Sequence, residues 1–175
     1  MMYRVAFGMV LAVGSAAMAG PIYDVSGLES IDGDGSALND FIDVPIFGHI
    51  HGVGWFLNVE TYGGSWLSEI NVRFTVADGT TMVLRPFEGM DFSGSMVLDS
   101  GGTIDTLGGP PFTDLIPSGD FLMRIELFES FVNAPGQVEA RFLAGSHMYF
   151  DQWVPTPGVG AVLGVALVLG GKRRR

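Results

Sequence analysis

The chain has 175 residues, with nine basic and nineteen acidic side chains and no cysteine. The absence of cysteine excludes disulfides, thiol nucleophiles, Cys-ligated zinc and a lipid-modified N-terminal cysteine. Five of the basic residues lie at the two ends, so the stretch between them holds four arginines and all nineteen carboxylates, a formal charge of −15. This charge disfavours nucleic-acid binding, which depends on Lys and Arg neutralising phosphates.

The first twenty residues contain the three parts of a secretory signal peptide. Arg4 supplies the positive charge, Val5–Ala17 is apolar, and Ala17-Met18-Ala19 is a small-x-small cleavage site. The apolar run is shorter than the ~20 residues of a spanning helix, which favours a cleaved signal over an uncleaved anchor. We therefore expect residues 1–19 to be the signal peptide, with Gly20 or Pro21 at the new terminus after cleavage.

An acidic, glycine-rich segment follows. Asp32-Gly33-Asp34-Gly35-Ser36, with Asn39, Asp40 and Asp43 after it, is the densest group of oxygen ligands in the chain. The segment is not an EF-hand, because the twelfth position is Asp43 instead of glutamate and the sixth is not glycine. Two interpretations stay open: a calcium site in a β-loop, using Asp32, Asp34 and Asp40, and a solvated turn.

The pair His49 and His51 lies on one face of an extended segment, because side chains repeat every second residue. With Glu60 as a third ligand, the pair could hold zinc or copper in a secreted metal-dependent hydrolase. Ordinary strand or loop histidines are the favoured interpretation, since no His-x-x-x-His helix accompanies them.

Alternation of apolar and polar residues predicts the central strands. One strand is expected over residues 53–59, with Trp55 on its apolar face, and another over 70–75. Ala77-Asp78-Gly79-Thr80 is the strongest hairpin turn, because Asp-Gly readily adopts positive φ angles, and residues 81–84 return as its partner.

Further strands are expected over residues 92–98, 121–128, 138–142 and 146–150, with a hairpin joining Met123 to Phe142. Seven or eight short strands with glycine-rich connections predict an all-β fold, a single β-sandwich or jelly roll over residues 20–153.

Catalysis has no supporting pattern. No Gly-x-Ser-x-Gly elbow is present. Glu126 and Glu129, three residues apart on a predicted strand, should point to opposite faces and so make a poor glycosidase pair. The chain is therefore predicted not to be an enzyme. Among the aromatic residues, Trp55 is expected in the core, whereas Trp66, beside a turn, is the candidate for stacking on a sugar.

The C-terminal residues 154–175 form a three-part tail. Val154-Pro155-Thr156-Pro157 ends the domain, because proline neither continues a helix nor donates to a sheet. Residues 159–171 are apolar, and Lys172, Arg173, Arg174 and Arg175 close the chain. The cations should stay in the cytoplasm. Thirteen helical residues rise only about 20 Å, so the tail suits a transient membrane stop.

This tail resembles the PEP-CTERM sorting signal of bacteria that use exosortase enzymes, in which a Pro-x-Pro motif, a short apolar helix and an arginine-rich end follow an exported domain. The usual motif is Pro-Glu-Pro, and here Thr156 takes the place of glutamate. The resemblance implies passage through the export machinery, transient insertion in the inner membrane, recognition by the sorting enzyme, and delivery to the cell surface or extracellular matrix. Separately, Gly119–Ile125 and Val138–Phe150 resemble the end of the P-domain-type jelly roll, which implies architecture alone.

The sequence thus predicts an exported surface or matrix protein that needs no cofactor. The first alternative is a calcium-assisted module that binds extracellular polysaccharide through Trp66. The second is the hydrolase built on His49 and His51.

Overall fold

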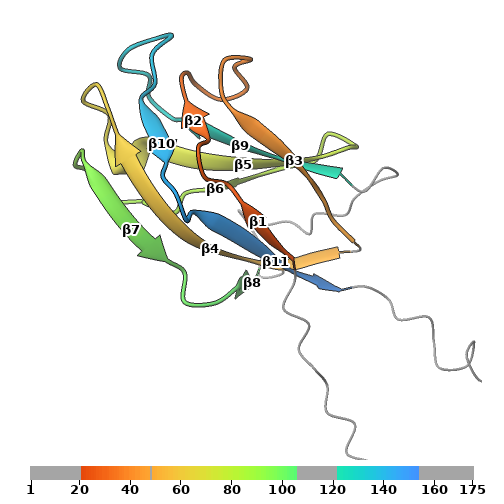
Figure 1. The fold of residues 1–175 in the computed structure, drawn as a ribbon. Coiled ribbons are helices and arrows are strands. Elements are labelled where there is room, and N and C mark those ends of the chain that lie inside the picture. Colours follow the sequence, from red (N-terminus) through yellow and green to blue (C-terminus); the bar gives the residue numbers. More distant parts are fainter. Residues whose placement is uncertain (1–20, 48, 106–121, 154–175) are drawn as a thin grey trace, which may run out of the picture.

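The computed structural model describes residues 21–47, 49–105 and 122–153. Within these residues the chain forms eleven β-strands and one 3-10 helix, shown in Figure 1: β1 (Ile22–Asp24), β2 (Glu29–Ser30), β3 (Phe41–Pro45), β4 (His49–Thr61), η1 (Leu67–Glu69), β5 (Ile70–Val76), β6 (Thr81–Leu84), β7 (Ser95–Asp99), β8 (Ile104–Asp105), β9 (Leu122–Glu129), β10 (Ala140–Phe142) and β11 (His147–Trp153). The prediction of an all-β fold is confirmed. Among the described residues, no helix is long and apolar enough to span a bilayer.

The strands form two antiparallel sheets. Sheet A has the order β1-β11-β4-β10-β2, and β7 and β8 also pair with β4. The central strand of this sheet is β4, which has thirteen residues and pairs with β7, β8, β10 and β11. Sheet B has the order β3-β9-β5-β6. The two sheets enclose one core, as in a β-sandwich; the finer assignment to the jelly rolls stays a prediction.

Alternating residues from both sheets fill the core, as the sequence pattern predicts. Trp55 on β4 is only 5% exposed, and the inward residues of β5 and β9 are fully buried. The rings of Phe74 on β5 and Phe150 on β11 meet edge to face, with their centroids 5.5 Å apart. This contact joins the two sheets at the middle of the core.

The β5–β6 hairpin is confirmed. Gly79 has a φ of 86°, and its N–H donates to the carbonyl of Val76 at 2.9 Å. The Thr80 N–H donates to Asp78 Oδ1 at 2.8 Å. The turn forms because glycine accepts the left-handed conformation without a Cβ clash and the aspartate satisfies a free N–H.

The predicted hairpin from Met123 to Phe142 is wrong. β9 pairs with β3 and β5 in sheet B, whereas β10 pairs with β2 and β4 in sheet A. The connection over residues 130–139 therefore crosses between the sheets. Alternation reveals which side of a strand is buried but does not reveal its partner, so strands that follow one another in the sequence need not pair. The strand predicted over residues 92–98 is also displaced, since β7 covers Ser95–Asp99.

The connections between the strands lie at two opposite ends of the domain. Four of them lie together at what we call the loop end: residues 31–40, 62–69, 85–94 and 130–139. The β5–β6 turn, the start of β1 and the end of β11 lie at the opposite end, which we call the tail end (Figure 1). Both chain ends thus leave the described domain away from the loop end.

Candidate functional site

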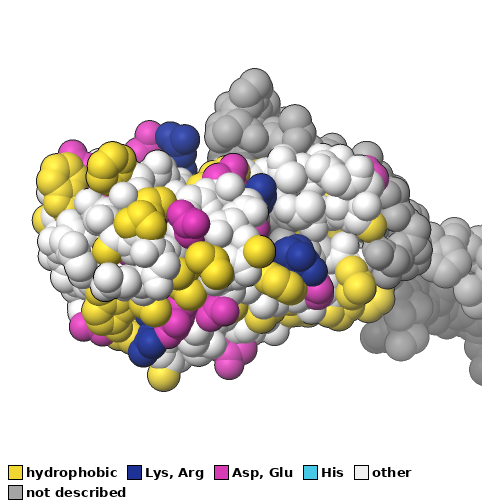
Figure 2. Space-filling view, turned by 90° about the horizontal axis from the view of Figure 1, so that it is seen from above, with side chains coloured by type: hydrophobic (Ala, Val, Ile, Leu, Met, Phe, Trp, Pro, Cys, Tyr) yellow, Lys and Arg dark blue, Asp and Glu magenta, His cyan; other side chains and the backbone are white. Residues whose placement is uncertain are grey.

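Three large aromatic side chains are exposed at the loop end. The exposed fractions are 47% for Trp66, 49% for Phe92 and 62% for Phe131. Backbone hydrogen bonds hold their segments together: Leu67 N–H donates to the Phe92 carbonyl at 2.9 Å, and Ser130 N–H donates to the Glu69 carbonyl at 2.9 Å. On the face shown in Figure 2, hydrophobic side chains form separate patches between acidic ones. Sequence reasoning selected Trp66 and missed the two phenylalanines.

A tight turn sets the exposure of Trp66. Gly63 and Gly64 both have positive φ angles, 64° and 97°, which reverse the chain after β4. The Trp66 N–H then donates to Glu69 Oε2 at 2.8 Å, and this bond caps η1. The indole lies on the outside of this capped turn, as predicted.

Two carboxyl groups are buried beneath these loops. Glu129, the last residue of β9, is 1% exposed, and Glu139, just before β10, is 0% exposed. The Ala134 N–H donates to Glu139 Oε1. Burial, and next the neighbouring Glu139 carboxylate, raise the pKa of Glu129 to about 8. The pKa of Glu129 is the one raised furthest among the described residues. Sequence reasoning missed the pairing of Glu129 with Glu139.

Asn133 ties the two connections around this pair together. Its amide Nδ2 donates to Ser65 Oγ at 3.1 Å and to Glu69 Oε2 at 3.2 Å. Ser65 also lies beside Glu129, although not in hydrogen-bond geometry. The loop end therefore has an aromatic exterior and a polar, acidic interior.

The three aspartates of the predicted calcium loop have separate protein partners. Asp32 accepts from Gly33 N–H at 2.8 Å and from Ser36 Oγ at 3.1 Å. Asp40 accepts from Glu29 N–H at 3.2 Å. Asp34 forms an ion pair with Arg73. The described part of the chain contains no group of three or more His, Cys, Asp or Glu side chains arranged to hold a metal. The calcium site at these aspartates stays a prediction.

A polar network fastens this acidic loop to the outer face of sheet B. Arg73 also contacts Glu126, with 3.3 Å between NH2 and Oε2. Buried Asn39 donates to Glu126 Oε1 at 3.1 Å and accepts the N–H groups of Ile31 and Asp32. Glu126 therefore faces outward while Glu129 faces the interior, on opposite faces of β9 as predicted.

The histidines lie in sheet A. His51 is half-buried in β4, and the side chain of His49 lies outside the described residues. His147 on β11 stacks on Phe56, with ring centroids 5.5 Å apart. Glu60, the suggested third metal ligand, accepts from Tyr62 Oη at 2.7 Å. Ring stacking within the sheet thus accounts for the position of His147, and the Tyr62 hydroxyl accounts for that of Glu60.

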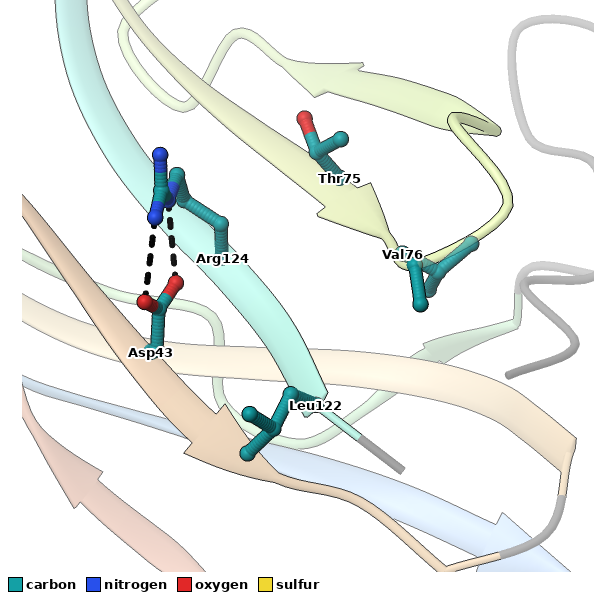
Figure 3. Close-up of a pocket in the computed structure, with 6 residues that line it drawn as sticks. Asp43, Thr75, Val76, Leu122 and Arg124 are labelled. Carbon is teal, nitrogen blue, oxygen red and sulfur yellow. Dashed lines mark hydrogen bonds and ion pairs between the residues drawn. The ribbon is translucent and has the colours of Figure 1, made fainter. Parts of the chain in front are cut away.

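A shallow hollow of about 230 Å³ lies beside the ion pair between Asp43 and Arg124 (Figure 3). Arg124 Nε and NH2 lie 2.9 and 3.0 Å from the two carboxylate oxygens. The hydrogen bond from Arg124 is the main cause that lowers the pKa of Asp43. The guanidinium carbon of Arg124 also lies 3.6 Å from the centroid of the Phe41 ring. Both charged side chains are more than 40% exposed, so this is a cross-strand surface pair.

A larger groove of about 830 Å³ opens between β6 and β8. Its wall includes Trp55, Pro86 and Ile104. The indole Nε1 of Trp55 is buried there without a hydrogen-bond acceptor among the described residues.

Comparison of the chain with protein-family models, with curated proteins and with solved structures found no match. The structure assigns the described residues to a class by their fold alone: an all-β domain of two antiparallel sheets. The predicted processing sites lie outside the described residues: Ala17, Ala19, Gly20, Val154, Pro155, Thr156, Pro157, Lys172, Arg173, Arg174 and Arg175.

Proposed function

We propose that this chain is an exported, non-enzymatic cell-surface or extracellular-matrix protein, in which residues 20–153 are the delivered domain. Residues 1–19 are its signal peptide, and residues 154–175 are a tail that an exosortase-type enzyme recognises at Pro155-Thr156-Pro157. The tail's apolar helix holds the chain briefly in the inner membrane before release.

The observation that carries this proposal is the order of the tail: a Pro-x-Pro motif, thirteen apolar or glycine residues, and four terminal cations. The fold is compatible with it. β1 begins at Ile22, two residues after Gly20, and β11 ends at Trp153, next to Val154. Both ends depart from the tail end, so a chain held by its tail would present the loop end outward (Figure 1).

Replacing Pro155 and Pro157 by alanine in the full chain should block sorting. The intact mass of the product in its native cells is the measurement, together with its distribution among cytoplasm, membrane, surface and medium. We expect the wild-type product to lack both ends and the variant to accumulate in the membrane with Arg175 still present.

Thr156→Glu is the matched control. It creates the usual Pro-Glu-Pro motif and should be sorted at least as well as wild type. A cytoplasmic wild-type product that retains Met1 and Arg175 would contradict the proposal. So would normal sorting of the double proline variant.

A second candidate function is polysaccharide binding at the loop end. The exposure of Trp66, with Phe92 and Phe131 on neighbouring segments, favours it. Aromatic faces suit sugar rings because one side of the ring is apolar while the hydroxyls stay hydrated. Polar groups lie on the same connections: Ser130 Oγ donates to the Glu69 carbonyl at 3.3 Å, and Asn133 Nδ2 donates to Glu69 Oε2 at 3.2 Å.

Trp66→Ala should weaken binding of the full chain to polysaccharide by about tenfold or more, because the variant loses a stacked aromatic surface. Pulldown with insoluble polysaccharides and a glycan array would measure it. Phe47→Ala is the control, since Phe47 is similarly exposed (54%) but precedes β4 at the tail end. Equal loss in both variants, or no binding of wild type to any glycan, would argue against this function.

A further inference from the structure

The interior of the loop end brings two acidic side chains together away from water. Glu129 comes from β9 in sheet B, and Glu139 comes from the connection that enters sheet A. They are 1% and 0% exposed. The two carboxylates interact with one another, and Glu69 adds a third negative charge nearby. Burial of like charges at one place is unfavourable unless something neutralises them.

The described basic side chains have other partners or positions. Arg73 pairs with Asp34 and Glu126, Arg124 with Asp43, and Arg141 with Glu29. Arg85 is exposed and lines the groove beside β6. Within residues 21–47, 49–105 and 122–153, no ion pair reaches Glu129 or Glu139. The pair therefore lacks a neutralising cation from this part of the protein.

Only one of the four carboxylate oxygens, Glu139 Oε1, accepts a hydrogen bond within the described residues, from the Ala134 N–H. Both carboxylate oxygens of Glu129 and Oε2 of Glu139 are buried without a hydrogen-bond partner among the described residues. The hydroxyl of Ser30, on β2, is also buried without a hydrogen-bond partner among the described residues. The side chain of Ser65 lies beside Glu129. Buried oxygens of this kind usually have a donor, a water or an ion.

We propose that Glu129 and Glu139 bind a divalent cation of the calcium type at the base of the loop end. Their carboxylates supply the charge, and Ser65 and water complete the oxygen ligands that calcium prefers. A single proton would neutralise only one carboxylate, whereas a divalent cation neutralises both. The strongly acidic domain also raises the local concentration of cations.

The position of the pair gives the cation a structural effect. Glu129 ends β9, and Glu139 is bonded through its backbone to Ser30 and Tyr62, with N–H to O distances of 2.8 and 2.7 Å. An ion between the two carboxylates therefore connects the sheets at their loop end. It also fixes the connections that carry Trp66 and Phe131.

The test compares thermal unfolding of the purified full chain in calcium and in EDTA, with direct titration of calcium by calorimetry. Wild type should bind one ion with an affinity near that of extracellular calcium modules, about 0.1 to 1 mM, and melt at higher temperature in calcium. Glu129→Gln and Glu139→Gln should each weaken binding by about tenfold or more and lose the calcium-dependent shift.

Asp32→Asn together with Asp34→Asn is the control, since these changes remove charge from the acidic loop and leave the buried pair intact. This control should keep the calcium response. Identical melting of wild type in calcium and EDTA would overturn the proposal without requiring any variant to fold. Loss of the response in the aspartate variant, with retention in the glutamine variants, would place calcium at the acidic loop and also overturn it.

Discussion

Glu129→Gln is expected to stabilise the fold at alkaline pH when divalent cations are absent. The pKa of Glu129 is about 8 in the folded protein, against 4.5 in its ordinary environment. The folded state therefore favours the protonated form. Its contribution to stability is complete below about pH 4.5 and is lost as the pH rises through 8. Glutamine keeps the shape without the charge, so the gain above pH 8 should be about 2 to 4 kcal/mol.

Chemical denaturation in EDTA at a series of pH values would measure this effect. Wild type should lose unfolding free energy between about pH 4.5 and pH 8, and the variant should lose much less. Glu88→Gln, at an exposed position, is the control and should follow wild type. Parallel curves for wild type and Glu129→Gln would show that the buried carboxyl does not titrate in this range.

Gly54→Ala is expected to destabilise the domain by about 1 to 3 kcal/mol, because it overpacks the centre of sheet A. Gly54 pairs with Tyr149 across β4 and β11, and the tyrosine ring covers the glycine. A Cβ at this position would lie 2.3 Å from two ring carbons. The ring must therefore leave its place or the strands must separate.

The double variant Gly54→Ala with Tyr149→Ala separates this clash from a general effect of alanine. Removal of the ring should recover part of the loss caused by Gly54→Ala, a positive coupling that a double-mutant cycle by thermal or chemical unfolding would measure. Gly33→Ala is the matched control, because its nearest neighbour would be 3.6 Å away and its φ is not positive. Equal costs for Gly33→Ala and Gly54→Ala would contradict the proposed clash.

Local patterns predicted the strands well where one face is fully buried. β4, β5 and β9 alternate with period two, and their inward residues are the ones the pattern selected. The short strands β1, β2, β3 and β8 were missed. They have two to five residues each, and so few residues do not produce a readable alternation.

The candidate site was only partly predictable. Trp66 could be selected because it follows a Gly-Gly turn. The nearness of Phe92 and Phe131 could not be foreseen, since it depends on how three separate connections lie at one end of the sandwich. The same holds for Arg73, whose partner Asp34 is distant in sequence.

The sequence by itself determined the charge of the domain, the absence of cysteine chemistry, the inward faces of the long strands, and the order of apolar and basic segments at the two ends. These features depend on composition or on residues close together in the sequence, and so they can be predicted without knowing which strands pair. Only the tertiary structure decided that β9 and β10 belong to different sheets, and that Glu129 and Glu139 meet. Pairing between distant segments depends on the sum of many contacts, and no single segment encodes it. The burial of these two carboxyl groups beside one another is a result of that pairing.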